Sequence, residues 1–241
     1  MVRPIAICAA VLATFCALDT NARGSESRLA LRAGRFPIYA YSPESKMDSP
    51  GARPVTIYLH GMCGDPSHGC GYFREGVAPS SWLLCPSATT PCPSGGAIWS
   101  GSTAERAAVI DDAERELVAT YGDAVDVTRG RVLIGFSQGA YLARNLIARK
   151  DSRYRGVMFI GADVQPTADA LRAAGVRRAV FASGRYDMMR RPLERAAEAL
   201  VQDGYPARFV DLGPVGHTYV PAADPLRMET MREALAWLED G

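Results

Sequence analysis

The chain has 241 residues, of which 48% are apolar and 22% charged, and its formal net charge is +1. This length suits one large domain and is too short for two ordinary ones. A charge close to zero supplies no basic field, which argues against nucleic acid as a partner.

The first residues differ in composition from the rest of the chain. A basic start at Arg3 precedes an apolar run over residues 5–18, and small residues stand at Thr20 and Ala22. This pattern predicts a secretory signal peptide over residues 1–22, too short to span a bilayer comfortably. An uncleaved anchor is the alternative. We expect residues 23–241 to form one secreted or periplasmic domain with no stable membrane insertion.

Four cysteines remain after removal of that segment: Cys63, Cys70, Cys85 and Cys92. An even number in an exported protein indicates disulfides. Of the three possible pairings we favour Cys63–Cys70 with Cys85–Cys92, because each closes a short loop beside a predicted strand end. The alternative is a zinc site built from Cys63, Cys70 and His68, although the spacing matches no common zinc module.

Short apolar runs predict the strands. In chain order they cover residues 36–42, 55–60, 81–85, 131–136, 156–161, 178–183 and 207–212. Most are apolar at consecutive positions, as is typical of strands covered on both faces. The run at 36–42 is expected to be an antiparallel leader strand.

Helical patterns lie between these strands. They cover residues 103–122, 137–150, 167–175, 191–204 and 225–240. Gly175 and Gly204 stand where helix C-caps belong. Alternating strands and helices predict an α/β fold, a three-layer α/β/α sandwich with a mostly parallel sheet. In such sheets the functional residues gather at the carboxyl ends of the strands.

One corner between a strand and a helix carries a G-x-S-x-G pattern. Ser137 lies between Gly135 and Gly139, directly after the strand at 131–136. This is the nucleophile-elbow arrangement, in which small neighbours permit a strained turn that lifts the hydroxyl clear of the sheet. The amide of Gln138, at a helix N-terminus, is placed to receive negative charge. A tight turn without chemistry is the alternative.

A serine nucleophile needs a base, and in an elbow fold the base follows the serine in the chain. His217 is the one histidine that follows Ser137 in the chain, which makes it the candidate base. An ordinary surface-loop histidine is the alternative. A carboxylate must then orient the imidazole. Asp163 and Asp187 both lie just past strand ends. We favour Asp187, because the acid usually comes from the loop after the second strand beyond the serine. Asp163 would then cap a helix or turn.

A second oxyanion donor is expected on the loop after the strand at 55–60. We assign it to the amide of Met62, with Gly61 allowing close approach and His60 orienting the loop through a hydrogen bond. Trp99, on a glycine-bearing loop at 93–102, is either one wall of an acyl pocket or a core anchor.

These motifs resemble the α/β-hydrolase superfamily, most of all the compact carboxylesterases and acyl-protein thioesterases, and more distantly the secreted polyhydroxybutyrate depolymerases and feruloyl esterases. The likeness covers roughly residues 53–241. It rests on "LHGMCGD" for the oxyanion loop, "GFSQGA" for the elbow, "GRYD" for the acid and "GH" for the base. The segment at 161–176 is too short to build a large cap, which implies an open site.

The resemblance implies a secreted serine hydrolase that cleaves small-molecule or polymer carboxylic esters through an acyl-enzyme. A peptidase or thioesterase with the same triad is the alternative within that class. A non-catalytic exported binding protein on the same fold is the alternative from another class. The cysteine-rich stretch at 63–92 departs from the cytosolic thioesterase pattern. No cofactor or metal is implied.

Overall fold

A computed structural model describes residues 28–33, 36–44, 51–77 and 79–241. The predicted signal peptide at residues 1–22 lies outside these ranges. Within them, no helix is both long enough and apolar enough to cross a membrane.

The middle layer is an eight-stranded sheet in the order β1-β2-β4-β3-β7-β8-β9-β10. The strands are β1 (Arg28–Ala33), β2 (Phe36–Tyr41), β3 (Val55–Leu59), β4 (Trp82–Pro86), β7 (Arg131–Phe136), β8 (Tyr154–Ile160), β9 (Arg178–Ser183) and β10 (Ala207–Asp211). From β4 to β10 every neighbour is parallel, whereas β2 is antiparallel to both β1 and β4. This confirms the mostly parallel sheet and its antiparallel leader strand. The structure adds β1 and a small hairpin of β5 (Thr90–Pro91) and β6 (Ala97–Ile98).

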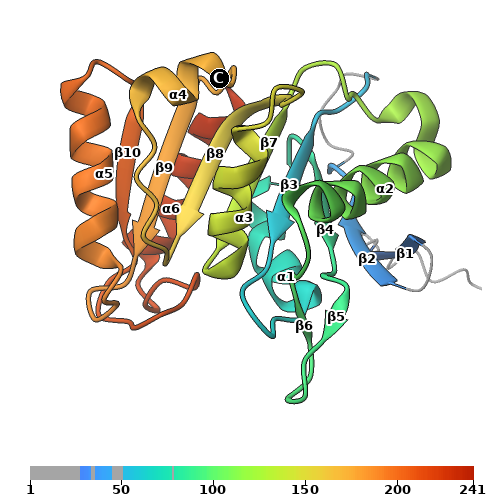
Figure 1. The fold of residues 1–241 in the computed structure, drawn as a ribbon, viewed down its shortest axis with the longest axis horizontal. Helices are drawn as coiled ribbons and strands as arrows, with labels where there is room; N and C mark the ends of the chain where they lie inside the picture. Colours follow the sequence, from blue (N-terminus) through green and yellow to red (C-terminus); the bar gives the residue numbers. More distant parts are fainter. Residues whose placement is uncertain (1–27, 34–35, 45–50, 78) are drawn as a thin grey trace, which may run out of the picture.

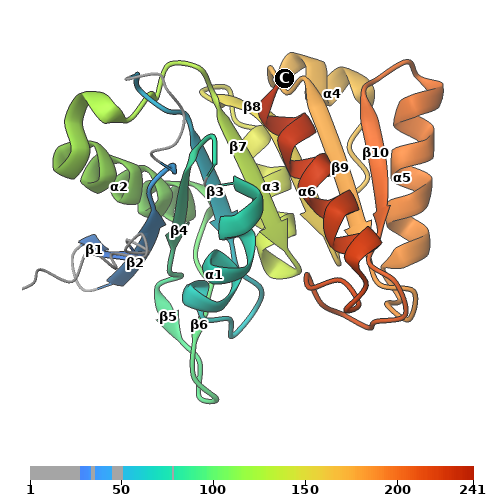
Figure 2. The same ribbon diagram turned by 180° about the vertical axis from the view of Figure 1, so that it is seen from behind.

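Helices cover both faces of this sheet. They are α1 (Pro66–Val77), α2 (Thr103–Tyr121), α3 (Gln138–Ile147), α4 (Ala168–Ala173), α5 (Arg190–Gln202) and α6 (Pro225–Glu239). Helices α2, α3, α4 and α5 lie on the face seen in Figure 1, and α1 and α6 lie on the face seen in Figure 2. The predicted α/β/α sandwich is therefore confirmed. Between β8 and β9 the chain builds only the six-residue α4, so no large cap stands there.

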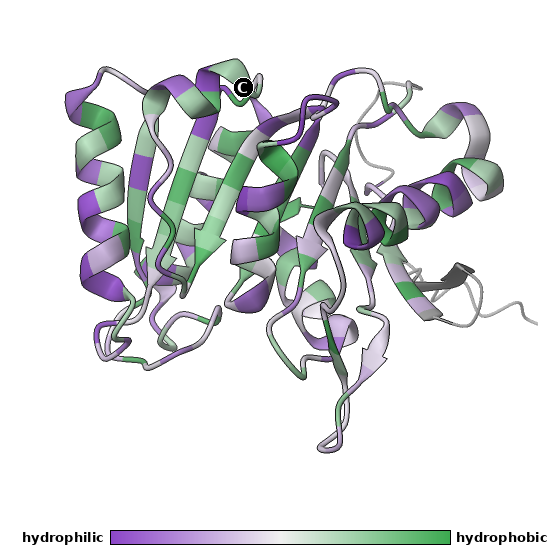
Figure 3. Ribbon diagram, viewed as in Figure 1, coloured by the Kyte–Doolittle hydropathy of each residue, from purple (hydrophilic) through white to green (hydrophobic). Residues whose placement is uncertain are grey.

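Two hydrophobic cores sandwich the sheet, one against each helical layer. In β7, Leu133 belongs to the core under α3, whereas Val132 and Ile134 belong to the core under α1 and α6. Side chains alternate between the two faces of a strand, so a strand buried on both faces must be apolar at consecutive positions. Figure 3 shows this pattern, with hydrophobic central strands and helices such as α2 and α5 carrying hydrophilic stretches.

The helix ends follow their local sequence. Ser102 and Glu105 form a reciprocal capping box at the start of α2, which satisfies two orphan amides. Gly175 and Gly204 adopt positive φ angles of 77° and 66° just after α4 and α5, as predicted for C-caps. Helix α1 was not predicted because its glycines weaken the helical pattern. Gly69 is nevertheless required there, since a Cβ would lie 2.1 Å from the Tyr58 ring.

The four cysteines form two disulfides, but the predicted pairing is wrong. The bonds join Cys63 to Cys92 and Cys70 to Cys85, so one is nested inside the other. Packing of α1 against β4 places Cys70 beside Cys85. The zinc alternative also fails, because both of its cysteines are in disulfides. No cluster of three potential metal ligands lies in the ranges that the structure covers.

Candidate active site

Ser137 occupies a strained corner between β7 and α3. Its φ of 52° and ψ of −116° are unusual for a residue with a side chain. The flanking glycines make this turn possible. A Cβ on Gly135 would lie 2.5 Å from the carbonyl oxygen of Gly139, and one on Gly139 would lie 2.1 Å from that of Leu59. The elbow expected from the sequence is therefore formed.

The structure brings Ser137, His217 and Asp187 into one hydrogen-bonded chain. Oγ of Ser137 lies 3.0 Å from Nε2 of His217. Nδ1 of His217 lies 3.0 Å from Oδ2 of Asp187. With its proton on Nδ1, the ring donates to the carboxylate and leaves Nε2 free to accept from the serine hydroxyl. These are the contacts that a serine nucleophile, its base and an orienting acid require.

The two candidate acids occupy different environments. The Asp187 side chain is 1% exposed, and its second oxygen accepts a hydrogen bond of 2.9 Å from the amide of Met189. Asp163 is exposed, and its carboxylate accepts a bond of 2.8 Å from the Gln165 side chain. Among the hydrogen bonds of the described residues, none joins Asp163 to His217. The structure thus connects His217 to Asp187, the acid that we favour from the sequence.

The loop after β10 carries His217 and is attached to the loop after β9. The amide of Tyr186 donates to the carbonyl of Val215 over 3.0 Å, and the amide of Arg185 donates to that of Gly213 over 2.7 Å. Gly184 permits this approach, because a Cβ there would lie 2.2 Å from the Val215 oxygen. These contacts fix the distance between the loop that carries His217 and the loop that carries Asp187.

The imidazole of His217 is supported from below by the central strands. Its ring centroid lies 5.0 Å from that of Phe136, the residue before Ser137. A Cβ on Gly161 would lie 3.0 Å from the ring, so the turn after β8 needs glycine at this point. The other side of the ring faces outward, and the side chain is 47% exposed.

The β3–α1 loop, residues 60–65, runs beside the elbow. A Cβ on Gly61 would lie 3.3 Å from Cβ of Ser137 and 3.0 Å from the Phe136 ring. This is the close approach expected of Gly61. Neither Met62 nor Gln138 uses its amide in a hydrogen bond to another described residue. Both amides are thus available to a ligand, in keeping with the oxyanion role predicted for them.

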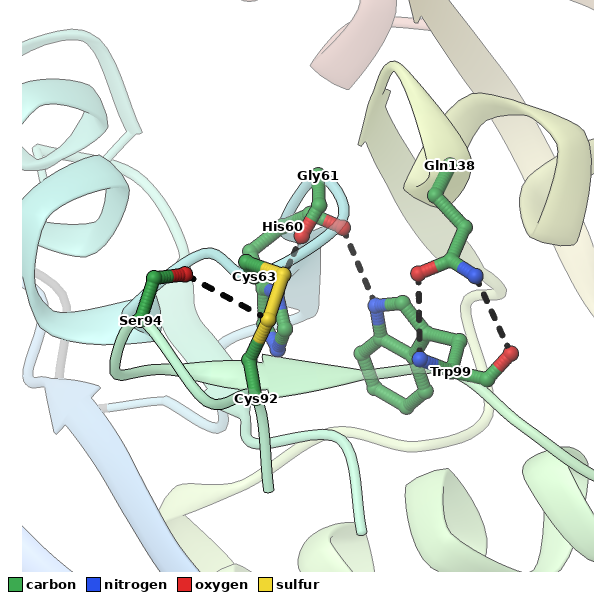
Figure 4. Close-up of a disulfide and its surroundings, with 7 residues drawn as sticks. All are labelled: His60, Gly61, Cys63, Cys92, Ser94, Trp99 and Gln138. Carbon is green, nitrogen blue, oxygen red and sulfur yellow. Dashed lines mark hydrogen bonds between the residues drawn. A yellow bond between two sulfur atoms is a disulfide. The ribbon is translucent and has the colours of Figure 1, made fainter. Parts of the chain in front are cut away.

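Gln138 connects the elbow to the β5–β6 hairpin through its side chain (Figure 4). Its Oε1 accepts from the amide of Trp99 over 3.0 Å, and its Nε2 donates to the carbonyl of Trp99 over 3.2 Å. The Trp99 indole N–H in turn donates to the carbonyl of His60 over 3.0 Å. Trp99 is only 3% exposed and belongs to the core. This burial favours the core-anchor interpretation over the pocket wall.

His60 orients the β3–α1 loop from within, as expected. The ring is buried, with Nδ1 donating to the carbonyl of Gly61 over 2.8 Å and Nε2 accepting from the amide of Ala88 over 3.0 Å. Burial lowers the pKa of His60, against the opposing effects of the Gly61 hydrogen bond and the charge of Asp65. The neutral ring is the form that this donor–acceptor pattern requires.

The disulfide between Cys63 and Cys92 ties the same loop to the hairpin (Figure 4). Cys63 has a positive φ of 55°, and the amide of Ala97 donates to the carbonyl of Gly64 over 3.1 Å. Gly96 is pressed against the loop, since a Cβ there would lie 2.4 Å from the Cys63 oxygen. Sequence reasoning missed this support, because no local pattern marks contacts between residues so far apart in the chain.

By sequence, the chain matches no protein-family model and no curated protein. Solved structures nevertheless share its architecture. A carboxylesterase from Mesorhizobium loti has 20% identity and a TM-score of 0.59, over 88% of this chain and 99% of that one. The esterase PE8 has 19% identity and a TM-score of 0.59, over 83% and 97%. A fluorophosphonate-binding serine hydrolase from Staphylococcus aureus has 14% identity and a TM-score of 0.56, over 86% and 93%. At these identities the likeness establishes an α/β-hydrolase fold without a large cap.

Proposed function

We propose that this protein is a serine hydrolase that cleaves carboxylic esters. The observation that carries the proposal is the hydrogen-bonded chain from Asp187 through His217 to Ser137, with both distances at 3.0 Å. It ends at a strained serine on the carboxyl edge of a parallel sheet, where α/β enzymes hold their active residues. The similar folds of an esterase and a carboxylesterase support the same reading.

Ser137, His217 and Asp187 each have one role in the reaction. Oγ of Ser137 attacks the ester carbonyl while Nε2 of His217 takes its proton, and Asp187 stabilises the imidazolium. Collapse of the tetrahedral intermediate breaks the bond to the alcohol, which leaves with the proton from His217. Water then attacks the acyl-enzyme with the same proton transfers, releasing the carboxylic acid and restoring the serine.

The amides of Met62 and Gln138 donate to the oxygen that becomes negative in the tetrahedral intermediate. Such donors are effective when they are held in place before the reaction. The side chain of Gln138, the indole of Trp99 and the ring of His60 supply that support. They connect the two donors through hydrogen bonds of 2.8 to 3.2 Å.

We further propose export to an oxidising compartment, with residues 23–241 as the mature domain after cleavage of the segment at 1–22. The two disulfides support this location, because such bonds persist outside reducing compartments. A peptidase or thioesterase would use the same triad, so the reaction class rests on the esterase-like neighbours and is decided by the experiment below.

The test is labelling of the purified protein with a fluorophosphonate probe, followed by a substrate panel. We expect wild-type protein to label at one site and Ser137→Ala to remain unlabelled. Matched p-nitrophenyl acetate, thioacetate and acetanilide substrates then rank ester, thioester and amide cleavage. A wild-type protein that neither labels nor hydrolyses any of the three is the non-catalytic binding protein. A preference for the anilide or the thioester replaces the esterase assignment.

A further inference from the structure

Large apolar side chains that face solvent are unevenly distributed over the described surface. The exposed members are Met62, Tyr141, Tyr186, Met188, Val201, Val220, Leu226 and Met228. All except Val201 belong to segments that follow the carboxyl ends of the parallel strands. We call the residues at this edge the apolar rim. Scattered exposed apolar residues are ordinary, but their concentration at one edge of the sheet is typical of a contact surface.

The rim comes from the same segments as the candidate active site. Met62 follows Gly61 and is 63% exposed, and Tyr141 lies one turn into α3 after Ser137. Tyr186 and Met188 flank Asp187, with exposures of 71% and 82%. All of these positions directly follow the carboxyl ends of β3, β7 and β9, which are parallel and share one edge.

The remaining members follow β10. Val220 lies three residues after His217, and Leu226 and Met228 begin α6. This end of α6 is fixed to the strand edge, because Arg227 donates to the carbonyl of Asp211 over 2.9 Å. Figure 2 shows α6 running from this edge back toward the opposite one. Val201, at the end of α5, lies at that opposite edge.

We propose that the apolar rim is a docking surface that brings Ser137 onto an uncharged, water-insoluble ester in its aggregated form. This inference rests on the proposed function and names its substrate class. Rim residues stand on both sides of Ser137 along the sheet, after β3 in one direction and after β9 and β10 in the other. An apolar phase that contacts the protein at this edge therefore meets exposed apolar side chains on both sides of the nucleophile.

The openness of the site supports an extended substrate surface. The base is 47% exposed, and α4 is too short to cover it. Three of the rim residues are methionines, whose flexible side chains adapt to irregular apolar surfaces. A protein partner seated on this rim would cover Ser137 and exclude substrate.

The cations that follow β9 and β10 at the rim are paired with carboxylates, whereas Arg144, 5.8 Å from the Tyr141 ring, has no ion pair among the described residues. Arg185, Arg190 and Arg227 all pair with Asp211, at 3.5, 2.8 and 3.3 Å. Arg190 also pairs with Glu194 over 2.7 Å, and Arg227 pairs with Asp224 over 3.5 Å. Three guanidinium groups are thus matched by three carboxylates, which leaves these cations little attraction for anionic headgroups.

The test compares the rate of hydrolysis of a dissolved ester with that of an aggregated ester. The rim variant is Met188→Ser with Leu226→Ser, and the matched control is Val201→Ser, an exposed apolar residue at the far edge. Substrates are dissolved p-nitrophenyl acetate and emulsified tributyrin. We expect the rim variant to lose about tenfold on the emulsion, since two apolar contacts are removed, and to keep its rate on the dissolved ester. Val201→Ser should match wild type on both.

Four results would overturn the inference. They are an unchanged emulsion rate in the rim variant, an equal loss on both substrates, an equal loss in Val201→Ser, and a wild-type dimer that the rim variant abolishes in sedimentation. Binding of catalytically inert Ser137→Ala to phosphatidylserine vesicles as tightly as to tributyrin droplets would assign the rim to a lipid surface instead. Failure of the proposed function is distinct, because wild type would then hydrolyse neither substrate.

Discussion

The two edges of the parallel sheet differ in backbone strain and in the burial of their ion pairs. At the carboxyl edge lie Cys63 and Ser137, the non-glycine residues of the described chain with positive φ. At the amino edge, Arg131 forms a largely buried ion pair with Glu114 of α2. Arg155 donates there to the carbonyl oxygens of Gly130 and Gly241, over 3.2 and 3.1 Å.

This difference separates two kinds of residue. Strain and unused donors at one edge are costs that persist only where the surrounding structure enforces them, and they are common at functional sites. Paired charges at the other edge hold α2, β7 and the C-terminal segment together. Substitutions in the hydrogen-bonded triad and its supporting loops at the carboxyl edge should therefore change turnover, and substitutions of the ion pair at the amino edge should change the free energy of unfolding.

The strongest test within the carboxyl edge contrasts the two acids. Asp187→Asn should lower kcat by about 10⁴-fold, because the amide favours the wrong histidine tautomer. Asp163→Asn, at the same edge but without contact to His217, should retain nearly all activity. Steady-state hydrolysis of p-nitrophenyl acetate measures both. If Asp163→Asn proved the more damaging variant, the acid would move to Asp163 while Ser137 and His217 kept their roles.

The disulfides offer a second contrast. Replacement of Cys63 and Cys92 by serine releases the β3–α1 loop and should lower kcat roughly 10- to 100-fold through displacement of the Met62 amide. The matched variant replaces Cys70 and Cys85 by serine, which releases α1 from β4 and should leave kcat unchanged. Both variants should melt earlier than wild type. Equal kcat in the two variants would show that the outer disulfide serves stability alone.

At the amino edge, Glu114→Gln should lower the free energy of unfolding by about 3 kcal/mol, because it leaves the largely buried Arg131 guanidinium without a counter-charge. Urea unfolding measures the loss, and kcat of the folded protein should equal that of wild type. Glu116→Gln on the same helix is the control, since no ion pair of Glu116 occurs among the described residues. A fall in kcat in Glu114→Gln would contradict the expectation that residues at the amino edge affect stability but not turnover.

The smallest effect concerns pH. Burial lowers the pKa of His60 from its ordinary value of 6.5. His60 therefore binds a proton more readily in the unfolded chain than in the folded one. The free energy of unfolding should decline as pH falls below about 6.5. The melting temperature of wild type and His60→Asn, followed from about pH 8 to about pH 5, measures this contribution. Parallel curves for the two proteins would show that His60 does not contribute to the pH dependence of stability.

Sequence reasoning located the elements that repeat a simple period and the residues that follow strand ends. Ser137, Asp187 and His217 each stand just past a strand, and parallel strands bring such positions to one edge. It failed where contacts depend on which element packs against which. Cys70 contacts Cys85 because α1 packs on β4. The glycines of α1 weaken its helical pattern, so the sequence does not predict that helix. It also left Trp99 ambiguous, because hydrogen bonds to Gln138 and His60 have no sequence signature.

The nesting of the two disulfides has a consequence for how the domain is oxidised. Direct closure joins residues 29 apart for Cys63–Cys92 and 15 apart for Cys70–Cys85. Once the inner bond exists, the outer closure spans only two stretches of 7 residues, 63 to 70 and 85 to 92. Halving a loop lowers its closure cost by about 0.6 kcal/mol, so each bond favours the other. The cysteines nearest in sequence, Cys63 with Cys70 and Cys85 with Cys92, nevertheless meet soonest during collapse of the chain. We therefore expect thiol exchange from those early pairs to the nested ones during oxidative folding of this chain.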